Sequence, residues 1–475
     1  MRSKRLTAMI AALGLTAAAC AGDDADTTPA TEAPSATEAP APEPETPDAP
    51  DTDDTADTDD TADTDDTDDT ADTDDTDDTA EHDMGAMDDD DDMADAGEMG
   101  SADTEPAVDD GASTLRAAMT SLLQEHVYLA GTTVVVAVEA GGDLDDPSVQ
   151  AAATELDANS VALADVVASV AGEENGEAFL GLWREHIGFF VDYTLGVATG
   201  DEAMAEQALT DLDGYTQAAG AFFEEITGGA IAADDLIGGL DGHITTLANA
   251  IDSVVAGETT AFTDLRRAAQ HMYGAALFLS DGIVAAAPEM FAGDVSSGPA
   301  ETRAILTDLL QEHVYLAGIA ITTAVDAGGD LEDPVVQAAV ATLDENSVAL
   351  ADVVTSVAGE ENGEAFLGLW REHIGFFVDY TLGVATGDEA MAEQARVDLD
   401  GYKQAAGAFF EEITGGEIPA DALVASLDVH TDTVFATIDS LIAADGRVFA
   451  ELRGAAQHMP MAALAIATGI VAATS

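Results

Sequence analysis

The segment LWREHIGFFVDY occurs twice in the chain, at Leu182–Tyr193 and again at Leu369–Tyr380. In the first copy, His186 stands three residues before Phe189 and four before Phe190. Residues at these spacings share one face of an α-helix, and an apolar face normally points into the core. The segment therefore predicts an amphipathic helix that carries a core-facing imidazole.

Both copies belong to a tandem repeat with a constant offset of 187 residues. Residues 169–208 and 356–395 are identical over their whole length, which indicates a recent duplication. Identity between the copies is therefore weak evidence that any one residue is required. Apart from His82, every histidine falls on the repeat, in the pairs His126/His313, His186/His373, His243/His430 and His271/His458.

Each copy has the pattern of six helices with short links. Period-two alternation is absent, and short links favour antiparallel neighbours. In the first copy, glycine-rich and acidic breaks separate helical patterns at 113–140, 147–171, 174–199, 201–227, 233–256 and 258–287. The predicted fold class is all-α, a tandem duplicate of a six-helix bundle built from three αα-hairpins, following a disordered acidic tether.

The predicted domain organisation follows from these patterns. It consists of a signal peptide at 1–19, the tether at 20–112, helical module 1 at 113–295 and helical module 2 at 300–475. No stretch of about 18 uncharged apolar residues after the signal is expected to span a membrane, although the last twenty residues are unusually apolar.

The N-terminus has the pattern of an export signal. MRSKR is a basic start, LTAMIAALGLTAAA is an apolar region too short for a stable membrane span, and Cys20 follows three alanines. This resembles a bacterial lipoprotein signal, in which the cysteine becomes the lipid-bearing N-terminus, although Ala17 stands where a bulkier aliphatic residue is usual. The resemblance implies lipidation at Cys20 and a place in the cell envelope, on the outer side of the cytoplasmic membrane. An ordinary secretory signal with an incidental cysteine is the alternative.

The chain is strongly acidic, with 95 Asp and Glu against 13 Lys and Arg and a formal net charge of −82. Such a surface repels nucleic acid and attracts cations. The tether has too little apolar surface to fold, and its end adds His82 and four methionines to the carboxylates. Thioether and imidazole are ligands that copper favours. The expected partners are therefore the membrane, through the lipid anchor, and cations, but no nucleic acid.

Histidines recur on the apolar stripes of several predicted helices. His126 lies three residues before Leu129 in the first helix, and His243 three residues after Leu240 in the fifth; His271 lies among alanines in the sixth. All four histidines of a module fall near helix midpoints, and antiparallel helices of similar length bring their midpoints to one level. A shared layer of four imidazoles is therefore predicted in each bundle.

A neutral imidazole in an apolar core needs a partner, because leaving it unpaired costs about 1–3 kcal/mol. A metal ion is one solution, since imidazole suits zinc, copper, iron and nickel. Met119 has the helical phase to join such a site, whereas Met272 lies about 100° from its neighbouring histidine and is expected to point elsewhere. The candidate ligands for copper or zinc are His126, His186, His243 and His271 in module 1 and His313, His373, His430 and His458 in module 2.

Other chemistry finds less support in the sequence. The Glu-x-x-His pairs of di-iron bundles, a Cys-x-x-Cys-His haem motif, phosphate loops and nucleophile motifs are all missing, so enzyme activity is not expected. The alternative to a metal site is a hydrogen-bond network of the histidines with Glu125, Glu185, Tyr128 or Tyr193, in a non-catalytic structural or interaction lipoprotein.

The rhythm LL-EHV-L, LW-EHI-F, QHM and SDGI resembles a loosely defined set of uncharacterised exported helical proteins of bacteria. The resemblance covers both modules and implies a helical fold and an extracytoplasmic location, without an established activity. Together, the residues favour a lipid-anchored extracytoplasmic binding protein with a His-lined metal site in each module.

Overall fold

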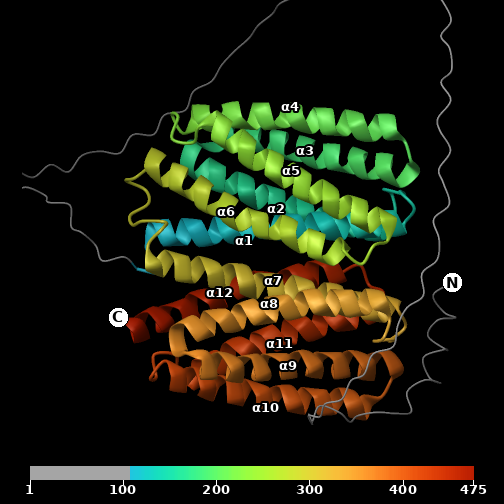
Figure 1. Ribbon diagram of the computed structural model, residues 1–475, viewed down its shortest axis with the longest axis vertical. Coiled ribbons are helices and arrows are strands. Elements are labelled where there is room, and N and C mark those ends of the chain that lie inside the picture. Colours follow the sequence, from blue (N-terminus) through green and yellow to red (C-terminus); the bar gives the residue numbers. More distant parts are fainter. Residues whose placement is uncertain (1–106) are drawn as a thin grey trace, which may run out of the picture. The chain divides into compact units, whose positions relative to one another are not determined.

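The computed structural model describes residues 107–475, which contain twelve α-helices and no strand (Figure 1). The predicted lipidation site Cys20 and the Met/His-bearing segment around His82 lie outside the described residues. The helices of module 1 are α1 (Gly111–Glu139), α2 (Pro147–Ala171), α3 (Glu173–Thr199), α4 (Glu202–Ile226), α5 (Ala233–Ala256) and α6 (Ala261–Ala286). Those of module 2 are α7 (Gly298–Asp326), α8 (Pro334–Ala358), α9 (Glu360–Thr386), α10 (Glu389–Ile413), α11 (Ala420–Ile442) and α12 (Val448–Thr474).

The all-α fold is confirmed, and its helices follow the sequence repeat. Each helix of module 2 begins 187 residues after its counterpart in module 1. The predicted range 147–171 coincides with α2, whereas the prediction of 258–287 began three residues too early for α6. Residues Glu258–Thr260 instead form a turn, in which the amide of Ala261 donates to the carbonyl of Glu258.

Local sequence explains where the helices begin and end. Asp110 caps α1 by accepting a 2.7 Å hydrogen bond from the amide of Ser113, and Asp201 caps α4 in the same way. Gly200 ends α3 with a left-handed backbone, φ 71°, which a residue with a Cβ adopts only at a cost. The sharp link between Gly200 and Asp201 sends α4 back along α3.

Each module is a closed bundle in which consecutive helices are neighbours and the sixth packs on the first. Module 1 therefore has α1 between α2 and α6, and module 2 has α7 between α8 and α12. The first helix of each module also packs against the first helix of the other, so that α1 and α7 lie together at the junction (Figure 1). One side of α1 consequently faces its own core, and the other faces module 2.

The contact between the two modules is polar. Its main hydrogen bond occurs twice, once from each module to the other. The rings of Tyr128 and Tyr315 stack at its centre, 5.0 Å apart and 11° from parallel. The hydroxyl of Tyr128 donates to Glu312 over 3.3 Å, and that of Tyr315 donates to Glu125 over 3.4 Å. Each module thus satisfies a buried carboxylate of the other.

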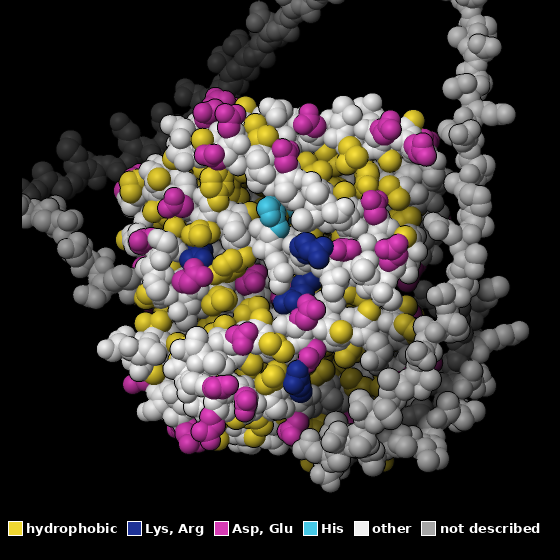
Figure 2. Space-filling view, viewed as in Figure 1, with side chains coloured by type: hydrophobic (Ala, Val, Ile, Leu, Met, Phe, Trp, Pro, Cys, Tyr) yellow, Lys and Arg dark blue, Asp and Glu magenta, His cyan; other side chains and the backbone are white. Residues whose placement is uncertain are grey.

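The visible face of the bundles carries acidic side chains scattered over its surface and only a few basic ones (Figure 2). The chain has ten basic residues after position 107, and each of them donates to a carboxylate, a hydroxyl or a backbone carbonyl within the described part. Most of these positive charges are paired with carboxylates, and the excess of carboxylates gives the surface its negative potential.

Three helices, α1, α7 and α12, are long and apolar enough to cross a membrane by length and composition alone. This corrects the expectation that no such stretch follows the signal. Within the fold, 50%, 72% and 50% of their apolar windows are buried. Packing inside the bundles therefore covers much of this apolar surface.

Candidate metal centre

Three of the four predicted histidines meet in the core of each module. In module 1 they are His126 from α1, His186 from α3 and His243 from α5, all at least nine-tenths buried. Their ligand nitrogens all lie within 4.8 Å of one another. His313, His373 and His430 form the same cluster in module 2. The alternate helices of the bundle thus each contribute one imidazole to a common point.

Two of the three imidazoles lie at nearly the same separation in both modules. Nε2 of His126 is 3.4 Å from Nε2 of His186, and Nε2 of His313 is 3.3 Å from Nε2 of His373. Two nitrogens bound tetrahedrally at 2.0–2.1 Å from one zinc ion are about 3.3–3.4 Å apart. The separation therefore fits a shared ion, and the nitrogen of the third imidazole, which lies within 4.8 Å of the other two, has to come closer by up to about 1.4 Å.

Several ring nitrogens in the clusters have no hydrogen-bond partner among the described residues. They include Nδ1 of His126 and of His313 and both ring nitrogens of His243. Burying a polar atom without a partner is costly, and native cores rarely leave one without a reason. Each neutral imidazole has one protonated nitrogen and one lone pair, so each histidine of a cluster can offer one ligand atom to an ion.

Burial keeps these imidazoles neutral at ordinary pH. Desolvation, with a smaller contribution from His243, lowers the pKa of His126 to about 3. Desolvation, with a smaller contribution from His271, lowers the pKa of His243 to about 4. The pKa of His186 is lowered well below its usual value by burial and by the two histidines beside it. Neutral imidazole is the form that binds metal ions.

Aromatic rings enclose the cluster of module 1. The indole of Trp183 lies 4.8 Å from the ring of His126 and 4.5 Å from that of His186, centroid to centroid. Tyr215 of α4 stacks on the ring of His186, 4.8 Å away and 22° from parallel. These rings fix the orientation of the imidazoles and exclude water from around them.

The fourth histidine does not join the cluster in either module, which corrects the predicted layer of four. Nε2 of His271 in α6 is 2.9 Å from the carbonyl oxygen of Gly239 in α5, and the ring is only half-buried. His458 similarly lies 3.1 Å from the carbonyl oxygen of Ser426. These two histidines tie the sixth helix of each module to the fifth.

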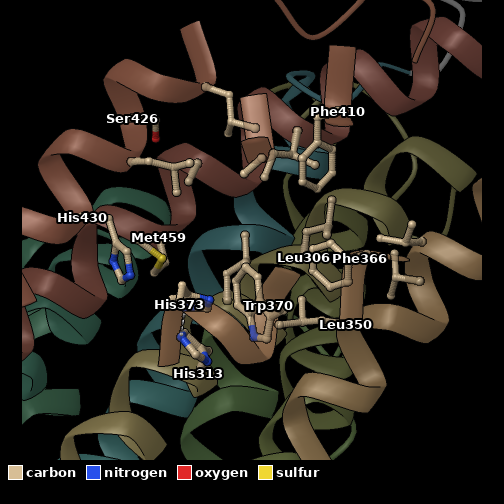
Figure 3. Close-up of a pocket in the computed structure, with 18 of the residues that line it drawn as sticks. Leu306, His313, Leu350, Phe366, Trp370, His373, Phe410, Ser426, His430 and Met459 are labelled. Atoms are coloured by element: carbon tan, nitrogen blue, oxygen red, sulfur yellow. Dashed lines mark hydrogen bonds between the residues drawn. The ribbon is translucent and has the colours of Figure 1, made fainter. Parts of the chain in front are cut away.

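The methionine next to the fourth histidine faces the core instead. Met459 lines a cavity together with His313, His373 and His430, and Figure 3 shows its thioether beside the imidazoles. Its counterpart Met272 is buried as well. The prediction that Met272 points elsewhere was therefore wrong, because its phase had been measured from a histidine that itself points outward.

The residues predicted to form a histidine hydrogen-bond network have other partners. Glu125 accepts from Arg453 and Asn159, and Tyr193 donates to Asp252 over 2.9 Å. Glu185 is exposed, and Tyr128 donates to Glu312 across the junction.

Comparisons with protein-family models, with curated proteins and with solved structures give no match for this chain.

Proposed function

We propose that the chain is a lipid-anchored extracytoplasmic protein that binds one copper or zinc ion in the three-histidine cluster of each module. The observation that carries this proposal is the pair of Nε2 separations, 3.4 Å and 3.3 Å, between buried imidazoles from different helices. The third imidazole supports it, because neither ring nitrogen of His243 has a partner among the described residues and an ion would satisfy one of them.

The ligand chemistry limits which ions fit. Imidazole nitrogens without carboxylates suit zinc and copper better than calcium or magnesium, which prefer oxygen. A thioether on the same cavity, as at Met459, adds a ligand that favours Cu(I). The proposed role is binding rather than catalysis.

Charge and location complete the proposal. The polyanionic surface raises the local concentration of cations, and the Met- and His-bearing end of the tether would collect copper before the modules do. The export signal ending at Cys20 supports a lipid anchor outside the cytoplasmic membrane.

Metal analysis of the purified chain tests the proposal directly. A tetherless variant that begins at residue 107 should retain two ions per chain after dialysis, and a chelator should lower its melting temperature. An ion present at a hundred times its dissociation constant adds about 2.7 kcal/mol to the free energy of unfolding. A chain that binds no zinc or copper, and melts identically with and without chelator, would leave only a helical scaffold lipoprotein.

Tryptophan fluorescence gives an independent measurement at the same sites. The chain has two tryptophans, Trp183 and Trp370, and each lies against a histidine cluster. Cu(II) bound at the clusters should quench their emission in proportion to occupancy. Quenching without saturation at two equivalents would indicate loose binding to surface carboxylates instead.

A further inference from the structure

The core of module 2 contains a cavity of about 70 Å³ that ends at the histidine cluster. All six helices of the module contribute to its wall, and the close-up shows His313, His373 and His430 on one side with leucines and phenylalanines on the other (Figure 3). Native cores are packed closely enough that a void of this size is unusual. Its position beside polar groups suggests a binding site.

The size of the cavity limits its occupant. An apolar cavity of about 150 Å³ takes benzene, which has six non-hydrogen atoms. By proportion, 70 Å³ suits about three. The wall is mainly aliphatic and aromatic, and a charged molecule would have to lose its hydration there without a counter-ion, which is strongly unfavourable.

Polar atoms at the histidine end provide a point of recognition. His430 is 7% exposed and lines the cavity, and its Nδ1 has no hydrogen-bond partner among the described residues. The indole Nε1 of Trp370, on the same wall, is a donor that also has no partner there. A ligand with one hydrogen-bonding end would satisfy a group that is otherwise left unpaired.

We propose that this cavity binds a small neutral molecule of about three non-hydrogen atoms, with an apolar body and one lone-pair end directed at the histidines. The inference goes beyond metal binding and holds for the metal-free protein. The proposal is made for module 2, where Leu306 lines the wall; the equivalent residue in module 1 is Met119. Methionine is unbranched and flexible, and it fills irregular gaps that leucine leaves open.

Acetonitrile is a suitable probe, since it is neutral, has three non-hydrogen atoms and ends in a nitrogen lone pair. The best ligands of this size reach a Kd on the order of 1 mM. Ligand-observed NMR on the chelator-treated chain should show saturable binding at one site, with Overhauser contacts from the acetonitrile methyl to the methyl of Met459. That resonance is assigned by its loss in Met459→Leu.

The matched variants are Ala462→Leu and Ala275→Leu, which change equivalent positions of the two modules. Ala462 lines the cavity, and leucine adds three carbon atoms there, enough to fill it. Ala462→Leu should abolish binding, whereas Ala275→Leu should leave it unchanged. Binding that persists in a folded Ala462→Leu variant overturns the proposal.

A second measurement covers the case in which Ala462→Leu does not fold. The contact with Met459 is measured in the wild-type chain, so its absence at saturating acetonitrile also overturns the proposal. Because no metal is present, neither outcome bears on the ion stoichiometry, and the two proposals fail separately.

Discussion

Arg453 of α12 donates to Glu125 of α1 over 2.8 Å, although 328 residues separate the two along the chain. The counterpart pair, Arg266 with Glu312, crosses the junction in the other direction over 3.1 Å. Each module therefore supplies the cation for a carboxylate buried in the other. The two modules are expected to unfold as one cooperative unit.

Replacing Arg453 with alanine should destabilise the chain strongly. Glu125 is 1% exposed, and removing the partner of a buried ion typically costs about 3–5 kcal/mol. Urea unfolding followed by circular dichroism measures the change. Arg184→Ala is the control, because its pair with Asp157 is half exposed and should contribute less than about 1 kcal/mol. If both variants lose a similar free energy of unfolding, the buried ion pair at the junction stabilises the chain no more than an exposed pair does.

Single-histidine variants should remove one ion each. His186→Ala and His373→Ala should each lower the metal content from two ions to one per chain, and the double variant should bind none. His271→Ala is the control, since its ring is bonded to Gly239 outside the cluster and its loss should leave two ions bound. If His271→Ala also binds one ion fewer, His271 is a ligand of the site after all.

Acid should destabilise the metal-free chain before its surface carboxylates titrate. Burial lowers the pKa of His126 to about 3 and that of His243 to about 4, whereas an unfolded histidine titrates near 6.5. The unfolded state therefore binds more protons below pH 6.5, so stability is present above that pH and is lost as the pH falls. Each such histidine contributes up to about 1.4 kcal/mol per pH unit.

Urea midpoints at pH 7.5, 6.5 and 5.5 measure this loss. His243→Gln should reduce the dependence on pH, because it removes one of the buried groups that must gain a proton on unfolding. A midpoint that stays constant over this range would show that the imidazoles are solvated or paired in the folded state.

The close approach of α3 to α4 should be sensitive to a single methyl group. A Cβ at Gly196 would lie 2.6 Å from the amide nitrogen of Ala205, which cannot move without shifting α4. Gly196→Ala should therefore destabilise by about 1–3 kcal/mol. Gly188→Ala, in the same helix but facing open space, should instead stabilise by about 0.5–1 kcal/mol. Equal effects of the two would indicate that α3 and α4 are loosely packed.

The helices and the three inward histidines could be predicted because local signals and helical phase agree there. In α3, Trp183, His186, Phe190 and Tyr193 share one apolar stripe, and all four are buried. Large side chains leave little doubt about which face of such a helix points inward.

The sixth helix was harder because His271 lies between Ala268 and Ala275, one turn away on either side. Small residues occupy the core and the surface equally well, so their positions do not show which face of the helix points inward. The larger side chains Leu265, Met272 and Leu279 recur every seven residues and are buried, and they place the inward stripe one residue away from His271. Weighting side-chain volume, rather than apolar character alone, would have found it.

The junction could not be predicted from one module. Arg116, Gln124 and Glu125 of α1 have the composition of a solvated face, yet all three are buried. Their burial depends on α7 and α12, and no short-range pattern in α1 encodes that contact. Glu125 and Glu312 each accept a hydrogen bond from a tyrosine of the other module, so their partners cannot be found from one module alone.

The helices α3 and α9 have the same sequence from first residue to last. During refolding, α9 presents the same Trp, His and Tyr side chains as α3, so α2 can also pair with α9, although the single residue between α2 and α3 favours the correct partner. Correct assembly must then rely on short loops and on the unlike first helices, and two chains at high concentration could exchange these segments. We therefore expect refolding to be slow and to depend on protein concentration, because the central helix was duplicated without alteration.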